Sequence, residues 1–389
     1  MFDVIVVGAG PAGAVAATVL ARGGARVLMV DRARFPRPKL CGDTINPGAL
    51  ALLRRLGMTG AFERAALTLD GMIVTGERDV QVRCAYGPGL HALSIVRETL
   101  DAALVAAATD SGVRFEESVL VRSALVDDGP ARRVRGIVMA GRDGGDVRVP
   151  APFVIAADGR RSTLAVALGL SRQPKRPRRW AIGGYFAGVE GLRRFGEMHV
   201  RRGRYIGVAP VPGGLANVCL VVPDPRNMDD PAAELKNAVA RDATLRDRFA
   251  KASLVDRPSV LGPLAVDARD AGIEGLVLAG DAAGFIDPMT GDGLRFAVRG
   301  GELAAQAVLA AMAGRIAHPH AALAVERRRE FAAKWRFNRA LRRLVGAPFA
   351  VQAGGLVASA APSILRKTIR FAGDVDLPQE IGKSGGQEA

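Results

Sequence analysis

The chain of 389 residues contains little of what disulfide scaffolds, metal proteins and nucleic-acid-binding proteins need. Its three cysteines, Cys41, Cys84 and Cys219, are odd in number and include no Cys-x-x-Cys pair, which is typical of a reducing compartment. The four histidines show no metal-ligand spacing beyond the pair His318 and His320, so the sequence predicts no metal site. Aromatic residues make up only 5% of the chain and do not alternate with basic runs, so we expect no nucleic-acid partner.

Basic residues, in contrast, are in excess over acidic ones. The chain has 54 Lys and Arg residues and 39 Asp and Glu residues, a net charge of +15. A basic protein favours an anionic membrane surface or an anionic substrate, although an Arg-rich and Ala-rich composition explains the excess as well. The first residues enter an apolar strand without the charged start and cleavage site of a signal peptide, which predicts a cytoplasmic location.

One segment near the C-terminus has no charge. It covers Leu344–Leu365 and is bordered by basic residues on both sides. Its length is near that of a membrane span, but two prolines and a glycine pair argue against one. Peripheral docking on the inner face of a membrane is an alternative. We favour two short helices that cover a substrate cavity.

The order of apolar segments predicts a mixed α/β (α+β) fold. A strand at Phe2–Val7, an Ala-rich helix at Ala12–Gly23 and a strand at Ala25–Val30 form a β-α-β unit with a parallel pair of strands. Short apolar strands recur at Phe153–Ala157 and Leu276–Ala279. The sequence thus predicts a Rossmann-type domain with a parallel sheet.

The middle of the chain has a different pattern. Residues 180–259 alternate strands with Gly/Pro turns and predict an antiparallel sheet over a cavity, with one helix near Ala232–Phe249. A strand is expected at Val113–Val121 and a helix at Arg97–Ser111, and the C-terminal region is expected to be helical.

A glycine-rich segment follows the first strand and opens the first helix. The run from Gly8 to Gly13 has the pattern Gly-x-Gly-x-x-Gly, and the next strand ends at Asp31. Gly10 lets the backbone approach a pyrophosphate at the helix N-terminus, and Asp31 can accept hydrogen bonds from ribose hydroxyls. The candidate cofactor-binding residues here are Gly8, Gly10, Pro11, Ala12, Gly13, Asp31 and Arg32.

A second glycine-containing segment lies far along the chain. A buried strand runs into Gly280 and Asp281, and a loop leads to a helix at Gly293. Free backbone N–H groups at that helix start suit an acceptor that gains negative charge. The candidate cofactor-binding residues here are Gly280, Asp281, Pro288, Gly291, Asp292 and Gly293.

Together with a helix start at Arg97 and the pair Asp158-Gly159, these segments resemble the FAD-dependent oxidoreductases of the aromatic-hydroxylase fold. The resemblance covers about residues 1–310 and is strongest to the geranylgeranyl reductase group. It implies a non-covalent FAD that contacts Arg97, lies near Asp158 and is bound through its ribityl chain by Asp281. It also implies that residues 288–293 line the isoalloxazine ring.

Two further segments can be compared with those of the geranylgeranyl reductase group. The loop from Lys39 to Asp43 resembles a loop of the reductase group that lies near the flavin, which adds Cys41 and Gly42 to the candidate binding residues, although Asp43 stands where a second glycine is usual. Residues 205–210 stand where that group has an aromatic-x-aromatic-x-Phe-Pro strand, and only Tyr205 and Pro210 match. The Trp-x-Trp-x-Ile-Pro segment of flavin halogenases is absent.

The resemblance also predicts the division of the chain. Residues 1–170, with a substrate-side insertion near 71–92, and residues 269–313 would form the FAD-binding domain. Residues 171–268 would form the substrate-binding sheet, and residues 314–389 a helical C-terminal region.

The expected reaction is NAD(P)H-dependent reduction of C=C bonds in a prenyl or other apolar lipid-like small molecule, by hydride transfer from the flavin. Cys41 is the candidate proton donor, although a small buried cysteine explains it equally well. An alternative is an FAD-dependent monooxygenase that hydroxylates or epoxidises an aromatic or polyketide-like molecule through a flavin hydroperoxide. Another is a non-catalytic FAD-binding redox module. The sequence does not choose between NADH and NADPH and does not predict an oligomeric state.

Overall fold

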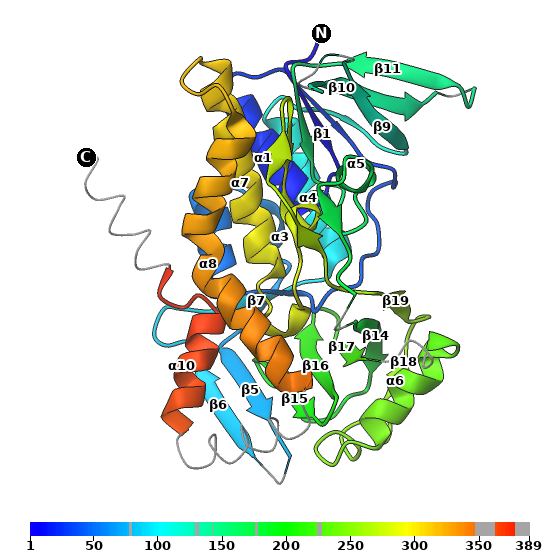
Figure 1. Cartoon of the computed structure of the whole chain (residues 1–389). Coiled ribbons are helices and arrows are strands. Elements are labelled where there is room, and N and C mark those ends of the chain that lie inside the picture. Colours follow the sequence, from blue (N-terminus) through cyan, green and yellow to red (C-terminus); the bar gives the residue numbers. More distant parts are fainter. Residues whose placement is uncertain are drawn as a thin grey trace.

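The computed structural model describes residues 1–77, 80–127, 129, 132–141, 143–175, 178–223, 228–346 and 362–377. These residues form a Rossmann-type part and an antiparallel part, which lie at opposite ends of the long helices (Figure 1). The fold is the mixed α/β fold that the sequence predicts.

The Rossmann-type part is built on a six-stranded sheet. Neighbouring strands are parallel except at the edge strand β21, which is antiparallel to β22. The strand order is β21 (Gly272–Ile273), β22 (Leu276–Leu278), β12 (Phe153–Ala156), β1 (Val4–Val7), β2 (Val27–Val30) and β8 (Arg114–Glu116).

Both faces of this sheet are covered, which explains the continuous apolar runs in its strands. On β1, Val4 and Val6 pack in one cluster with helices α1 (Pro11–Arg22), α4 (Arg97–Asp110) and α7 (Gly293–Met312). Ile5 and Val7 pack on the other face. That face is covered by β9 (Val121–Val126), β10 (Val134–Ala140), β11 (Asp146–Pro150) and α5 (Thr163–Ala167).

Helices α1 and α7 pack closely, and this contact brings the two glycine segments together. A Cβ atom at Gly301 of α7 would lie 2.3 Å from the carbonyl oxygen of Ala12 in α1, so only glycine permits the observed approach. Because α1 begins at the first glycine segment and α7 at the second, both segments face the same space.

The antiparallel part is an eight-stranded sheet. Its path is β18 (Ser253–Leu254), β14 (Trp180–Ala187), β17 (Leu215–Val222), β16 (Arg204–Val211), β15 (Phe195–Arg201), β5 (Gly71–Thr75) and β6 (Gln81–Ala85), with β19 (Ser259–Leu261) paired to β14. Strands β5 and β6 come from the segment near 71–92, and β5 joins β15 in parallel. Helix α6 (Pro231–Ala240) packs on the outer face, and the inner face is turned toward the Rossmann-type part.

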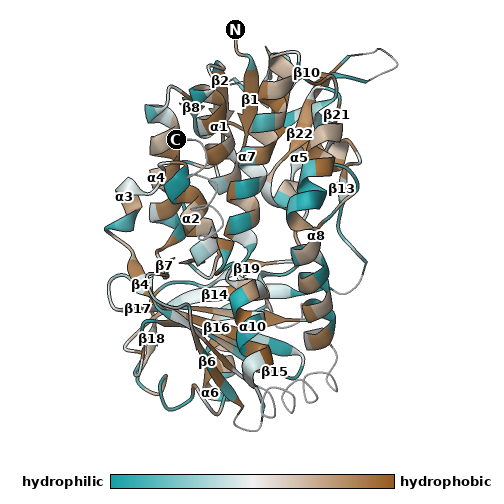
Figure 2. Ribbon diagram, turned by 90° about the vertical axis from the view of Figure 1, so that its left-hand side faces the viewer, coloured by the Kyte–Doolittle hydropathy of each residue, from teal (hydrophilic) through white to brown (hydrophobic). Residues whose placement is uncertain are grey.

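Smaller elements complete the described chain. They are β3 (Thr44–Ile45), β4 (Leu67–Leu69), β7 (Ala92–Ser94), β13 (Ser171–Arg172), β20 (Asp267–Ala268), α2 (Pro47–Arg55), α3 (Gly60–Glu63), two 3-10 turns η2 (Gly280–Ala283) and η3 (Pro288–Thr290), α8 (Pro319–Gly346) and α10 (Pro362–Ala372). Helix α8 runs along α7, and α10 packs against β6 in front of the antiparallel sheet (Figure 2).

Two expected elements differ from the structure. The helix expected at Ala232–Phe249 ends at Ala240, because the buried carboxylate of Asp242 accepts the N–H of Thr244 and diverts the backbone into turns. The strand expected at Val113–Val121 is interrupted. Ser118 adopts φ 61°, and the chain leaves β8 for β9, which belongs to another sheet.

No helix among the described residues is long and apolar enough to cross a bilayer. Most of the uncharged segment 344–365 lies outside the described residues, so the interpretation of two short helices there is not decided. Its two ends belong to α8 and α10.

Candidate functional site

A cavity of about 740 Å³ runs from the glycine turn after β1 to the inner face of the eight-stranded sheet. Its walls come from segments far apart in the sequence: the β1–α1 turn, the loop 37–44, the β22–α7 segment, the sheet, and the ends of α8 and α10. The size is within the range of cofactor and small-molecule sites.

The glycine turn leaves space for a ligand at one position only among its three motif glycines. Gly8 has φ 99°, and a Cβ atom there would lie 2.4 Å from the carbonyl oxygen of Ala157. A Cβ atom at Gly13 would lie 1.8 Å from the carbonyl oxygen of Gly8. At Gly10 the nearest atom is an Arg37 nitrogen 3.6 Å away, and the N-terminus of α1 has no side-chain cap. This open, uncapped helix start fits the diphosphate of FAD.

Asp31 is oriented at the end of β2 by the backbone. Its two carboxylate oxygens accept N–H hydrogen bonds from Ala9 and Ala33, both at 2.8 Å. Each oxygen keeps a second lone pair that can accept a ribose hydroxyl. Asp31 and Arg32 both line the cavity, as do Pro11 and Ala12.

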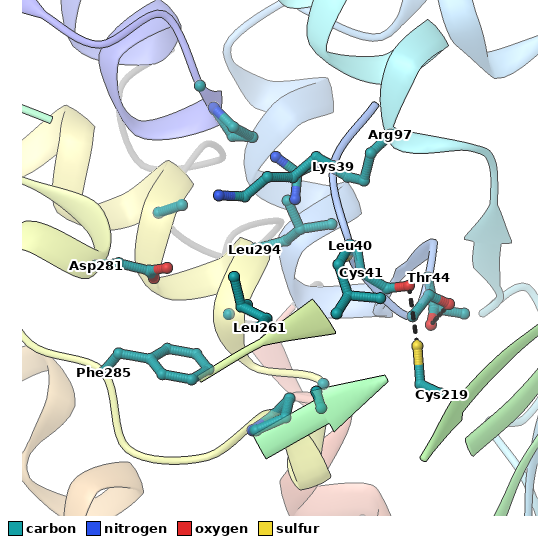
Figure 3. A pocket seen from close by; sticks show the side chains of 18 of the residues that line it. Lys39, Leu40, Cys41, Thr44, Arg97, Cys219, Leu261, Asp281, Phe285 and Leu294 are labelled. Carbon is teal, nitrogen blue, oxygen red and sulfur yellow. Dashed lines mark hydrogen bonds between the residues drawn. The ribbon is translucent and has the colours of Figure 1, made fainter. Parts of the chain in front are cut away.

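Basic side chains gather in the middle of the cavity (Figure 3). Arg97 is buried at the start of α4 and forms two hydrogen bonds with Asp101, at 2.8 and 2.9 Å. Arg37 forms an ion pair with the same carboxylate at 3.2 Å. Burial lowers the pKa of Lys39, and Asp281 opposes that shift. A diphosphate would balance the positive charge of this group.

Two carboxylates of the predicted site line the same cavity. Burial raises the pKa of Asp281, whereas Lys39 and Arg97 act to lower it. Asp158 accepts the N–H of Thr163 at 2.9 Å with one oxygen, while its other oxygen is buried without a hydrogen-bond partner among the described residues. An unpartnered buried oxygen fits a site that is completed by a polar ligand.

The second glycine segment is placed at the far side of the cavity. Gly280, Asp281, Pro288, Gly291 and Gly293 line it. Asp292 is not among the lining residues. Its buried carboxylate accepts hydrogen bonds from Lys334 at 3.0 Å and Asn338 at 3.2 Å, both on α8. The carboxylate of Asp292 therefore holds α8 against the start of α7.

The loop that carries Cys41 and Gly42 is tied to the sheet through Asp43. Asp43 adopts φ 52° and is buried. Its carboxylate accepts hydrogen bonds from Tyr185 Oη at 2.6 Å, Asn217 Nδ2 at 2.7 Å and the N–H of Arg97 at 3.2 Å. Burial raises its pKa to about 6, against the effect of these donors.

Cys41 lies on the cavity side of this loop. Its carbonyl oxygen accepts hydrogen bonds from Asn217 Nδ2 at 3.0 Å and from the Cys219 thiol at 3.3 Å (Figure 3). Burial raises the pKa of the Cys41 thiol, and the neighbouring Arg97 guanidinium opposes the shift. The thiol therefore keeps its proton at neutral pH.

Beyond the loop the cavity becomes an apolar chamber over the sheet. Its floor combines small side chains with the larger Met198, Tyr205 and Asn217 on neighbouring strands, and its walls include apolar residues from both C-terminal helices. The small floor residues are Ala181, Gly207, Ala209, Cys219 and Val221, and wall residues include Leu261, Phe285, Phe337, Leu341, Leu365 and Ile369.

Sequence reasoning missed several of these residues. Arg37 and Lys39 follow Asp31 in the same loop, and Arg160 directly follows the Asp158-Gly159 pair, so proximity to the motifs was the available signal. The partners of Asp43 on β14 and β17 had no such signal, because they reach the loop only through the fold.

Comparison with known proteins agrees with this geometry. The family described as FAD binding domain matches residues 1–336. Menaquinone reductase of Mycolicibacterium smegmatis is 30% identical over 390 residues, which cover 96% of this chain and 91% of that protein. Digeranylgeranylglycerophospholipid reductase 2 of Methanopyrus kandleri is 30% identical over 318 residues, covering 79% and 78%.

Among solved structures, the myxobacterial chondrochloren halogenase superposes with a TM-score of 0.80 at 23% identity, covering 87% of this chain and 81% of that chain. At this identity the likeness shows the shared fold. The matches confirm the resemblance to the aromatic-hydroxylase fold and its reductases. The chain belongs to the FAD binding domain family and is an FAD-dependent oxidoreductase similar to the geranylgeranyl reductase group.

Proposed function

We propose that this protein uses NADH or NADPH to reduce a C=C bond of an apolar, prenyl-type lipid. The observation that carries the proposal is the largely apolar chamber, which is continuous with the cofactor cleft and has several small side chains in its floor. Such a chamber suits a bulky apolar substrate and excludes water from its reacting carbons. The two relatives named above support the choice, because both are named as reductases and one name specifies a digeranylgeranyl lipid.

Different residues of the cavity would bind different parts of FAD and donate the proton. The N-terminus of α1 and the cations Arg37, Lys39 and Arg97 would hold the diphosphate, and Asp31 and Asp281 would bind hydroxyl groups. When bound, FAD supplies hydride transfer. Reduction of a C=C bond also needs a proton, and Cys41 is the candidate donor because it lines the cavity and its thiol stays protonated.

Stopped-flow spectroscopy without oxygen tests the reaction. NADH or NADPH should bleach the flavin, and a prenyl lipid added anaerobically should restore its absorbance and leave a product with one C=C bond fewer. If restoration requires oxygen and the product carries a new oxygen atom, the protein is a monooxygenase and the proposal is wrong. If neither nicotinamide bleaches the flavin, the proposed reductant is wrong.

The same experiment tests Cys41. In Cys41→Ala, bleaching by the nicotinamide should be unchanged, while reoxidation by the lipid should slow by roughly a hundredfold, as expected for loss of a general acid. Cys84→Ala is the matched control, because Cys84 is buried under α10 but does not line the cavity. Equal rates in Cys41→Ala and wild type would remove Cys41 as the donor.

A further inference from the structure

Helix α10 separates the cavity from the surface, and its two faces differ. On the inner face Leu365, Thr368, Ile369 and Ala372 line the cavity. On the outer face Ile364 is 54% exposed and Phe371 is 42% exposed, although large apolar side chains are costly to leave in water. Arg366 and Lys367, which lie between these two residues in the sequence, are also exposed. In Figure 2 this helix lies in front of the sheet, and both hydrophobic and hydrophilic turns are visible.

The end of α8 continues this surface. The rings of Phe337 on α8 and Phe371 on α10 are in edge contact, with their centroids 5.1 Å apart. Further along α8, Leu344 is 40% exposed. The exposed basic residues of this part of α8 are Arg336, Arg339 and Arg343.

The charge of this region has one sign. From Phe331 to Gly373 the sequence contains eight Lys and Arg residues and neither Asp nor Glu. Within the described part of the chain, the exposed basic residues of α8 and α10 named above form no ion pair with a carboxylate. Their charge is therefore available to an external anion.

Helix α10 is also held firmly at its C-terminal end. Lys334 of α8 donates hydrogen bonds to the carbonyl oxygens of Phe371 and Ala372 and forms an ion pair with Asp374 at 3.1 Å. Arg295 of α7 reaches the same carboxylate at 3.1 Å. The exposed apolar residues thus stand on a helix that is fixed to the body of the protein.

We propose that this surface binds the protein to an anionic membrane. The docking face is defined as Leu344, Ile364 and Phe371 with the basic residues Arg336, Arg339, Arg343, Arg366 and Lys367. The apolar side chains enter the headgroup region, and the basic ones lie against anionic lipid headgroups.

Docking in this orientation places the cavity wall against the bilayer. An apolar lipid then passes beside α10 into the chamber without crossing water. This consequence rests on the proposed function, whereas the docking itself does not.

Flotation with lipid vesicles tests the docking face on the full-length protein loaded with FAD. The wild type should float with vesicles of mixed phosphatidylglycerol and phosphatidylcholine and not with phosphatidylcholine alone. Arg366→Glu/Lys367→Glu should weaken vesicle binding by roughly 30-fold or more, since each basic residue near an anionic surface contributes substantially. Ile364→Glu should weaken it as well.

Matched controls separate the docking face from the net charge of the whole protein. Arg328→Glu/Arg329→Glu changes the net charge equally on an exposed part of α8 away from α10, and Val325→Glu alters a side chain that is 62% exposed. Both controls should bind within about twofold of the wild type. Thermal unfolding and FAD content confirm that each variant is folded.

The proposal is overturned if the wild type does not bind anionic vesicles, if the α10 variants bind as well as the wild type, or if the α8 controls lose binding to the same degree. Self-association in place of vesicle binding would identify the face as an interface between copies of the chain. Since no substrate or nicotinamide is present, these outcomes do not depend on the proposed reaction.

Discussion

Asp43 lies in the loop that carries Cys41 and Gly42. Its carboxylate is buried, and its backbone adopts a left-handed conformation. The conformation costs little for glycine and more for other residues, so the side chain must be compensated by its contacts. It accepts hydrogen bonds from Tyr185, Asn217 and the N–H of Arg97, and these contacts connect the loop to the sheet and to α4. We therefore assign Asp43 a positioning role for Cys41 and Gly42.

This role has a consequence for pH. Burial raises the pKa of Asp43 from 3.8 to about 6, so the folded state binds a proton more readily than the unfolded state. The stability that arises from this protonation is fully present below pH 3.8 and is lost as pH rises through about 6. Compared with Asp43→Gly, the wild type should be relatively more stable at about pH 5 than at about pH 7.5, by about 1 kcal/mol.

Urea unfolding of both proteins at the two pH values measures this difference, and the contributions of the other titrating groups cancel in the comparison. Glycine is the suitable replacement because it adopts φ 52° without strain. A difference in unfolding free energy that does not change with pH would show that the folded-state pKa of Asp43 is not raised.

Residues were predictable where a local backbone constraint shaped the sequence. A Cβ atom at Gly8 would collide with the carbonyl oxygen of Ala157, and one at Gly13 would collide with the carbonyl oxygen of Gly8. Both positions therefore require glycine, and the pattern can be recognised from the sequence alone. Asp292 shows the limit. Its place in a glycine-rich turn predicts a cofactor contact, but its carboxylate is bound by two residues of α8 that no local pattern connects to it.

At the scale of elements, strand β16 determines the depth of the chamber. Its inward positions include Gly207 and Ala209, which stand where the reductase group has larger aromatic side chains. A Cβ atom at Gly207 would have its nearest neighbours at 3.9 Å, so there is space above the strand. At Gly207 the strand thus leaves this part of the chamber open.

Filling this space should affect the substrate and spare the cofactor. Gly207→Phe should weaken binding of the lipid by roughly tenfold or more, because the ring would occupy the chamber, while FAD content stays unchanged. Gly207→Ala is the graded control and should be close to wild type. Anaerobic reoxidation rates over a range of lipid concentrations measure the effect. Unchanged lipid affinity in Gly207→Phe would place the substrate elsewhere.

The types of the long elements were predictable, and some of their ends were not. Helix α4 was expected at Arg97–Ser111 and is found at Arg97–Asp110, because its apolar periodicity is local. The helix expected at 232–249 ends early because Asp242 binds Arg201 on β15, at 2.8 Å, as well as the N–H of Thr244. That ion pair joins residues distant in sequence, and a single sequence does not show it.

At the scale of the whole molecule, the candidate cofactor site is assembled from segments near both ends of the Rossmann-type part. The segment at Gly8–Gly13 and the segment at Gly280–Gly293 meet because α1 packs on α7. The two motifs and their order were sufficient to predict the family, but the walls contributed by α8 and α10 were not predictable, since those helices carry no motif. FAD would contact several parts of the fold at once, so its binding should stabilise all of them together.

Thermal unfolding with and without FAD tests this coupling. Because FAD would bind the folded state alone, a thousandfold excess over its dissociation constant should add about 4 kcal/mol to the free energy of unfolding. Gly10→Val should remove this gain and lose FAD, because its side chain would occupy the open space before α1, while the FAD-free protein remains folded. Gly13 is unsuitable for the test, since a Cβ atom there collides with the Gly8 carbonyl whether FAD is present or not. If Gly10→Val keeps its flavin and the full gain in stability, the diphosphate does not lie at the start of α1.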